Sequence, residues 1–316
     1  DMVLKPDQSI ASKAVESTFE SPLSTSVISR EQIMNSGAMS IPEALRLAPG
    51  VIVREKTPGN FDVHLRGLDN IPPNNLMLYS ENSITLVMID NRVIYNYAHG
   101  GTLWETLPIS VHDIARIEVM RGPASTLYGS NAVSGVINIV TKEVVNPEFD
   151  VDVHAEGGYP LGTNTNINAK FGPSKDLKFR ISGNYQHFKR TTNTFYMWPF
   201  EGYYARDSID APNPDNNGLP IKPHLAENYF PNPDLAKDRY GINFYGYYTP
   251  TDDINIRLSA GNQHSEIISS IIDDSFTSYA RRLSTTNYVD VHGNVNNFKG
   301  QVYYTQGTQD ISKGSD

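Results

Sequence analysis

The chain of 316 residues is long enough for two domains, and it contains no cysteine, which excludes disulfides, thiolate catalysis, cysteine-ligated zinc and iron–sulfur clusters. Its formal net charge of −9 argues against binding to a phosphate backbone, so we expect no nucleic-acid partner. Only 39% of residues are apolar and 18 are tyrosine, and the mean hydropathy is −0.40. No apolar run has the length of a transmembrane helix, whereas strands of a membrane β-barrel would leave no such run.

The first 25 residues are polar and rich in serine, which is typical of a tail or linker. One short hydrophobic patch, Met2-Val3-Leu4, lies near their start. Two interpretations of this patch stay open. It is either a segment that a partner protein captures by strand addition or a frayed chain end.

Two short helices are predicted next, and each begins at a serine. Ser29 is followed by Gln32 and Ser40 by Glu43, which places Gln or Glu at the third helical position, as in a capping box. Strands are then expected over residues 51–53, 61–65, 85–89 and 92–94. The strand over 61–65 alternates apolar and polar residues and is expected to be half-buried, and the last two strands form a hairpin around Asp90-Asn91.

Residues 107–142 carry the densest pattern of the chain. Ser110, with Asp113 three residues later, begins a short helix before an apolar strand over 117–120. That strand stops at Arg121-Gly122-Pro123. A short helix over 124–128 follows, Gly129 ends it, and a second strand is expected over 136–141.

The same stretch resembles the C-terminal signature of the plug domain of TonB-dependent outer-membrane receptors. The matching residues are Ile117, Glu118, Arg121, Gly122, Pro123, Ser125, Tyr128, Gly129, Ala132, Gly135, Ile137, Asn138, Ile139, Thr141 and Lys142. Segments around Arg66-Gly67 and Asp90 also resemble plug segments in order and spacing, so the resemblance covers roughly residues 25–142. It implies that Met2, Val3 and Leu4 form a TonB box, the segment that inner-membrane TonB captures.

Two loops between the predicted plug strands combine aromatic and amide side chains. The resemblance places such loops at the plug apex, which faces incoming substrate, and these residue types suit a ligand site. The alternative is a pair of polar loops lying against the barrel wall. The candidate substrate-binding residues are Asn74, Asn75, Tyr79, Tyr95, Tyr97, His99 and Trp104.

From about residue 149 the apolar residues recur at every second position. Seven strands are predicted, over residues 149–155, 165–171, 177–185, 240–248, 254–260, 283–291 and 298–304. Short connections, at 172–176, 250–253 and 292–296, alternate with longer ones at 191–237 and 267–281, which is typical of outer-membrane barrels. The short connection at 160–162 departs from this alternation. A soluble β-sandwich shows the same strand periodicity.

Seven strands are not expected to be the whole barrel. An open sheet of an odd number of strands would leave the backbone groups at its edges unsatisfied in lipid. The resemblance implies a barrel of about twenty-two strands. We therefore expect an α+β plug domain followed by antiparallel transmembrane β-barrel strands of an incomplete barrel. The expected boundaries are 1–25 for the tail, 26–145 for the plug and 146–316 for the strands.

No motif for covalent chemistry is found: the chain lacks a nucleophile elbow, a Walker loop, a dinucleotide fingerprint and an H-E-x-x-H pair. The eight histidines are scattered, and residues 213–218 imitate a calcium loop whose twelfth position is His224 instead of Glu. We expect no catalytic residues, no cofactor and no metal. Arg66 and Arg121 each precede a glycine, and the resemblance implies that they reach acidic residues on the barrel wall; the alternative is a simple surface arginine.

These observations predict TonB-dependent import of a bulky or scarce nutrient across the outer membrane of a Gram-negative bacterium, the plug gating the lumen. The expected partners are TonB with its inner-membrane energising complex, outer-membrane lipid, and a siderophore, vitamin, glycan or peptide substrate. The alternative is a non-transporting, receptor-like scaffold in a larger outer-membrane complex, possible partners including a surface lipoprotein. A soluble lectin is disfavoured, because it leaves the plug signature without a role.

Overall fold

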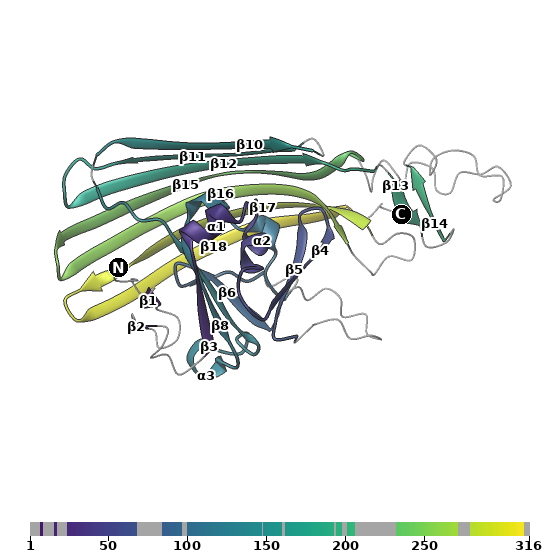
Figure 1. The fold of residues 1–316 in the computed structure, drawn as a ribbon. Coiled ribbons are helices and arrows are strands. Elements are labelled where there is room, and N and C mark those ends of the chain that lie inside the picture. Colours follow the sequence, from purple (N-terminus) through teal and green to yellow (C-terminus); the bar gives the residue numbers. More distant parts are fainter. Residues whose placement is uncertain are drawn as a thin grey trace.

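A computed structural model of the protein describes residues 7–8, 16–17, 24–67, 84–96, 100–146, 148–159, 162–192, 194–197, 201–205, 232–270 and 279–312. It contains two bodies (Figure 1). Seven long strands form one curved sheet, and a smaller mixed domain lies against a single face of it. Among the described residues, no helix has both the length and the apolar character needed to cross a membrane.

The large sheet consists of consecutive antiparallel neighbours in the order β10-β11-β12-β15-β16-β17-β18. Its strands are β10 (Asp150–Gly158), β11 (Gly162–Phe171), β12 (Leu177–Lys189), β15 (Leu235–Thr251), β16 (Ile254–Ser270), β17 (Tyr279–Val295) and β18 (Phe298–Ser312). All seven correspond to predicted strands, and each is longer than the sequence pattern suggested. The prediction of antiparallel strands with a period of two is confirmed.

The long connection between β12 and β15 contains structure that the sequence analysis missed. We expected a loop there, but β13 (Thr194–Met197) pairs antiparallel with β14 (Gly202–Ala205). Phe195 and Met197 are fully buried in this hairpin, whereas Tyr203 is exposed. A strand of only four residues carries too little alternation to stand out from its surroundings.

The two faces of the large sheet reverse the usual distribution of polar and apolar groups. One cross-strand row on the outer face holds Ile181, Phe244 and Val289, which are 39%, 36% and 48% exposed. The adjacent positions Ser182 and Asn243 point to the opposite face and are at most 1% exposed. Apolar side chains are thus outside and polar side chains inside, which is the arrangement expected of a strand whose outer face meets lipid.

The mixed domain, called the plug below, contains a five-stranded sheet in the order β3-β8-β9-β6-β7, in which β6 and β9 are parallel. Its elements are β3 (Ser24–Ser29), α1 (Arg30–Asn35), α2 (Ile41–Leu45), β4 (Val51–Thr57), β5 (Asn60–Leu65), β6 (Thr85–Ile89), β7 (Arg92–Val93), η1 (Trp104–Thr106), η2 (Val111–Asp113), β8 (Ile114–Arg121), α3 (Ser125–Tyr128) and β9 (Gly135–Thr141). The short strands β1 (Asp7–Gln8) and β2 (Glu16–Ser17) pair with each other.

Local sequence explains where the plug's short helices begin. The Ser29 hydroxyl accepts a hydrogen bond from Gln32 N at 3.2 Å, and the Gln32 side chain accepts one from Ser29 N at 2.9 Å, which completes the predicted capping box. Ser110 and Asp113 form the same reciprocal pair at η2. These caps fix the ends of elements that are too short to be stable helices in isolation.

The hairpin around Asp90 and the conformation of Gly135 shape the centre of the plug. Asp90 and Asn91 both adopt positive φ, at 49° and 65°, as a two-residue hairpin turn requires. Gly135 has a φ of 154°, and a Cβ atom there would lie 2.2 Å from the Met120 carbonyl oxygen. Glycine is therefore needed at the start of β9, where the strand passes close to β8.

The strand β5 is not half-buried as predicted, because both of its faces are covered. Phe61, Val63 and Leu65 lie in the plug core, and Asp62 and His64 on the other face are only 5% and 2% exposed. β5 and its neighbour β4 contact β16 of the large sheet, so the polar face of the strand is covered as well.

Candidate functional site

Most residues predicted to bind TonB or substrate lie outside the described part of the chain. This holds for Met2, Val3 and Leu4, and for the loop residues Asn74, Asn75, Tyr79, Tyr97 and His99. Their proposed roles stay predictions. Tyr95 and Trp104 are the two described members of the substrate-binding set, and they occupy different environments.

Tyr95 lines a cavity of about 570 Å³ that separates plug residues 92–108 from strands β17 and β18. Trp104 is instead only 3% exposed and belongs to the main hydrophobic core of the plug. Its position at the start of η1 turns the indole inward. This location favours packing rather than the predicted contact with substrate.

The acidic and amide residues of the plug signature form a buried polar network inside the plug sheet. Glu118 on β8 is fully buried and accepts a hydrogen bond from the Asn138 amide on β9 at 3.3 Å. The Asn138 side chain also bonds Asn91 in the hairpin turn, donating to its side chain and accepting from its backbone. Arg116 pairs with Glu118 at 2.9 Å. Burial and the nearby Glu118 carboxylate raise the pKa of Tyr128 to about 12.

The signature arginine Arg121 makes its described hydrogen bonds within the plug. Its guanidinium donates to the Pro49 carbonyl and, at 2.8 Å, to the Ser26 hydroxyl. Burial and the neighbouring Arg66 lower the pKa of Arg121. The bonds of Arg121 tie β8 to the loop between α2 and β4 and to β3. The implied contact of Arg121 with an acidic residue on the barrel wall stays a prediction.

In the buried ion pairs between the plug and the large sheet, called the wall below, the wall supplies the arginines and the plug supplies the acids. Arg257 on β16 contacts Asp90 at 2.7 Å, and both side chains are at most 8% exposed. Asp90 also accepts hydrogen bonds at 2.9 Å from the Thr141 backbone and hydroxyl. The carboxylate thus joins the plug hairpin, the end of β9 and the wall at one point.

Three further wall arginines reach the segment 105–113 of the plug. Arg282 on β17 pairs with Glu105 at 2.5 Å, and Arg180 on β12 contacts Asp113 at 3.3 Å. Arg239 on β15 donates to the carbonyl oxygens of Leu107 and, at 3.1 Å, Ile109. Together with Arg257, each of the four neighbouring strands β12, β15, β16 and β17 therefore contributes one buried arginine to the inner face.

Tyrosine rings support these buried guanidinium groups. Arg180 lies 3.8 Å from the ring centroid of Tyr245, and Arg257 lies 5.4 Å from those of Tyr245 and Tyr247. One such contact involves an arginine of the plug instead of the wall: Arg92 lies 3.8 Å from the ring centroid of Tyr288 on the wall. Burial lowers the pKa of Arg92. Contacts of a cation with an aromatic face partly replace the water that these charges lose.

Arg180, Arg239, Arg257 and Arg282, called the arginine layer below, are the functional feature that was not predicted from the sequence. Arg180 directly follows the apolar Phe179 in the predicted strand over 177–185, so the period of two places it on the polar face, but that period does not show that four strands share an arginine layer. The signal was present, because a charged residue at an inward position of a membrane strand must meet a partner in the lumen. Finding that partner requires the strand register and the placement of the plug.

Comparisons with known proteins agree with this arrangement. Residues 17–136 match the family model described as the TonB-dependent Receptor Plug Domain. The chain therefore contains a plug domain of the TonB-dependent receptors. The relatives of this receptor chain are outer-membrane proteins of Gram-negative bacteria, in agreement with the predicted localisation, and they are receptors and transporters rather than enzymes.

Two curated relatives illustrate the similarity in sequence. The vitamin B12 transporter BtuB of Vibrio vulnificus is 32% identical over 140 residues, covering 42% of this chain and 21% of that protein. The ferrienterobactin receptor of Escherichia coli is 29% identical over 202 residues, covering 58% of this chain and 26% of that protein. The receptor chain thus spans about a quarter of the length of these relatives.

Solved structures show the same fold. The alcaligin outer-membrane receptor FauA of Bordetella pertussis superposes with a TM-score of 0.61 at 17% identity, covering 96% of this chain and 42% of that one. The ferric enterobactin receptor PfeA of Pseudomonas aeruginosa, in a mutant form bound to enterobactin, gives 0.57 at 16% identity, with 91% and 41% covered. The predicted fold class, a plug followed by part of a barrel, is confirmed.

Proposed function

We propose that this receptor imports a scarce nutrient of the ferric siderophore or vitamin class across the outer membrane, with energy delivered through TonB. The observation that carries the proposal is the polar plug–wall interface, in which Asp90, Glu105 and Asp113 meet arginines of the wall. A plug held by ion pairs and hydrogen bonds can separate from the wall and be rehydrated, whereas a large apolar interface would resist separation.

The substrate class is inferred from the relatives. One is named a vitamin B12 transporter, and others are named receptors for ferrienterobactin and ferrioxamine B. Tyr95, which lines the cavity next to β17 and β18, is the described residue that best fits a role in substrate contact. An aromatic side chain there offers a large contact area with few rotors to immobilise.

TonB coupling is proposed through the N-terminal tail. In this proposal residues 1–25 are the tail, 26–145 the plug and 146–316 the barrel strands, and Met2, Val3 and Leu4 form the strand that TonB captures. Force applied to the tail reaches the plug first at β3, because that strand follows the tail in the chain. β3 pairs only with β8 within the plug sheet, so it is an edge strand that can detach without breaking the rest.

Uptake measurements on a deletion strain test the proposal. The strain, complemented with the wild-type receptor, is expected to accumulate at least one labelled compound from a panel of ferric siderophores and cobalamin. Deletion of residues 1–5 is expected to abolish uptake while leaving the amount of receptor in the outer membrane unchanged. A matched deletion of five residues within the serine-rich segment 9–15, away from the hydrophobic patch, is expected to retain uptake.

Two results would contradict import. The first is uptake that persists at the wild-type level in the 1–5 deletion. The second is a receptor that binds no compound of the panel yet co-purifies with other outer-membrane proteins irrespective of the tail. The second result would favour the scaffold alternative.

A further inference from the structure

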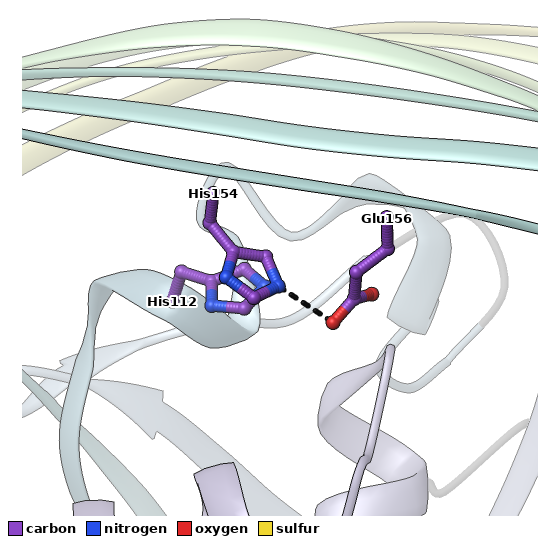
Figure 2. A group of neighbouring side chains, drawn as sticks. All are labelled: His112, His154 and Glu156. Atoms are coloured by element: carbon purple, nitrogen blue, oxygen red, sulfur yellow. Dashed lines mark hydrogen bonds and ion pairs between the residues drawn. The ribbon is translucent and has the colours of Figure 1, made fainter.

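Three side chains with metal-ligating atoms meet where η2 of the plug approaches the first strand of the wall (Figure 2). His112 lies on η2, and His154 and Glu156 lie two residues apart on the inward face of β10. The residues come from both sides of the plug–wall interface, 42 positions apart in the chain. They take no part in the arginine layer described above.

The ligand atoms of the three side chains lie near enough to one another to be considered as ligands of one metal ion. The His154 Nε2 atom lies 2.6 Å from Glu156 Oε1, and the two imidazole rings are 3.7 Å apart between centroids, inclined at 33°. One ligand atom from each residue can be chosen so that all three lie within 4.8 Å of one another. Ligands of a single tetrahedral zinc, each about 2.1 Å from the metal, lie about 3.4 Å apart. Side-chain rotations would have to bring the three atoms to that spacing around one ion.

An orphaned nitrogen points to a missing partner. His112 is 4% exposed, and its Nε2 atom is buried without any hydrogen-bond partner in the structure. A buried polar atom without a partner destabilises the folded protein. The pairing of His154 with Glu156 leaves this nitrogen unexplained, whereas a metal ion between the three side chains would satisfy it.

We propose that His112, His154 and Glu156 form a site for a divalent transition metal, Zn²⁺ in the first instance, that links the plug to the barrel wall. Two imidazole nitrogens and one carboxylate oxygen form a donor set that suits zinc, while calcium and magnesium prefer oxygen ligands throughout. A fourth position remains for water. The proposal does not depend on import, since the ion would bind whether or not the receptor transports.

The surroundings are compatible with a bound cation. Asp113 adds a nearby negative charge, and Arg30, which donates to the His112 carbonyl at 3.1 Å, adds a positive one. Glu156 also lines a cavity of about 390 Å³ between the plug and strands β10–β12, which gives an ion a route of entry.

No metal was expected, because the eight histidines are scattered along the sequence and no pair has helical i, i+4 spacing. A site assembled from a plug turn and a wall strand leaves no such local pattern. Its single local sign is the alternation that puts His154 and Glu156 on one face of β10.

Zinc binding to the purified receptor tests the proposal. The receptor containing this chain, solubilised in detergent and stripped with a chelator, is dialysed against micromolar zinc chloride and analysed for bound metal. One zinc ion per chain is expected beyond the amount bound by Glu156→Gln. His154→Asn and His112→Gln should each weaken zinc binding by at least about tenfold in calorimetric titration, because each removes one ligand.

A matched control is available on another wall strand. His292 and Asp290 on β17 are also two residues apart and lie 3.1 Å from each other, but no third ligand-type side chain joins them among the described residues. His292→Gln is therefore expected to retain the wild-type zinc content and affinity.

Folding of each variant is checked separately. The Glu156 side chain is 32% exposed, so Glu156→Gln should leave the receptor folded, as judged by circular dichroism and elution volume. Zinc is also expected to raise the thermal unfolding temperature of the wild type and not of Glu156→Gln. A wild-type receptor that binds no zinc, or zinc content that persists in all three variants, would overturn the proposal.

Discussion

Apolar and polar residues alternate in both the plug and the barrel sheet, but the apolar residues are buried in the plug and exposed on the outer face of the sheet. In the plug, Ile117 and Val119 on β8 are fully buried in a water-excluding core. In the wall, Ile181 on β12 is 39% exposed on the outer face, while its neighbour Ser182 is completely buried. Periodicity therefore determines which residues share a face of a strand, and the surrounding medium determines which face is exposed.

The two regions meet largely through charged and hydrogen-bonded groups. The wall contributes arginines and the plug contributes acids, so the contact resembles neither the plug core nor the outer face of the sheet. Four experiments test this division of the molecule, and they are ordered by the size of the effect that each should have.

Breaking the Asp90–Arg257 pair should have the largest effect. Asp90→Ala is expected to lower the free energy of unfolding by about 3–5 kcal/mol, because Arg257 stays buried without its partner carboxylate. Urea unfolding of the receptor in detergent measures the loss. The control Asp152→Ala removes the exposed pair with Lys142 and should cost less than about 1 kcal/mol.

A double variant makes the same test more selective. Asp90→Ala combined with Arg257→Met is expected to recover part of the loss, since replacing both charges by apolar groups removes the unpaired charge. Equal instability of the single and double variants would show that the charge of Arg257 is not what Asp90 compensates.

Truncating one isoleucine in each region compares the two kinds of packing directly. Ile117→Ala should destabilise the plug by about 2–5 kcal/mol, because it leaves a cavity in a fully buried core. Ile181→Ala should cost less than about 2 kcal/mol, because acyl chains can fill the space at the outer face. Denaturant titration in lipid vesicles measures both. A larger loss for Ile181→Ala would contradict the assignment of the outer face.

Removing a helix cap should have a smaller effect that is confined to the plug. Ser29→Ala deletes the hydroxyl that accepts from Gln32 N and is expected to destabilise by about 1 kcal/mol. The expected change is a shift of a few degrees in thermal unfolding, whereas Ser29→Asp, which retains a capping oxygen, should stay close to the wild type. Identical shifts for both substitutions would argue against the cap.

The smallest effect is a pH dependence that originates in β5. Burial opposes ionisation of Asp62, but its hydrogen bond and charge interaction with His64 prevail and hold its pKa below the ordinary value of 3.8. A carboxylate with a depressed folded pKa adds stability above pH 3.8, and that stability is lost as the pH falls through the folded pKa. Unfolding temperatures between pH 5 and 2 should therefore fall less steeply in Asp62→Asn than in the wild type. Parallel curves would contradict this assignment.

The sequence predicted local features well where the cause was local. Ser29 with Gln32, the Asp90-Asn91 turn and the strict alternation around Ile181 each determine structure within a few residues, and all three appear as expected. The signature glycine Gly135 is explained by its close approach to Met120.

Features that depend on contacts between distant segments were not predictable. The burial of the polar face of β5 requires the wall to lie against it, and the arginine layer requires the register of four strands. Trp104 shows the same limit. Its position in a loop suggested contact with substrate, but the fold of η1 places its ring in the core.

The arginine layer has a consequence for any passage that opens beside the plug. In the proposed import, movement of Asp90, Glu105 and Asp113 away from the wall would leave Arg180, Arg257 and Arg282 without their counter-charges. Arg239 would lose its carbonyl acceptors, and all four guanidinium groups would line the vacated space. Such a lining attracts anions and repels cations, and low-dielectric walls strengthen the field. Movement of the plug away from the wall would thus create an electrostatic filter that admits negatively charged solutes and repels free metal ions.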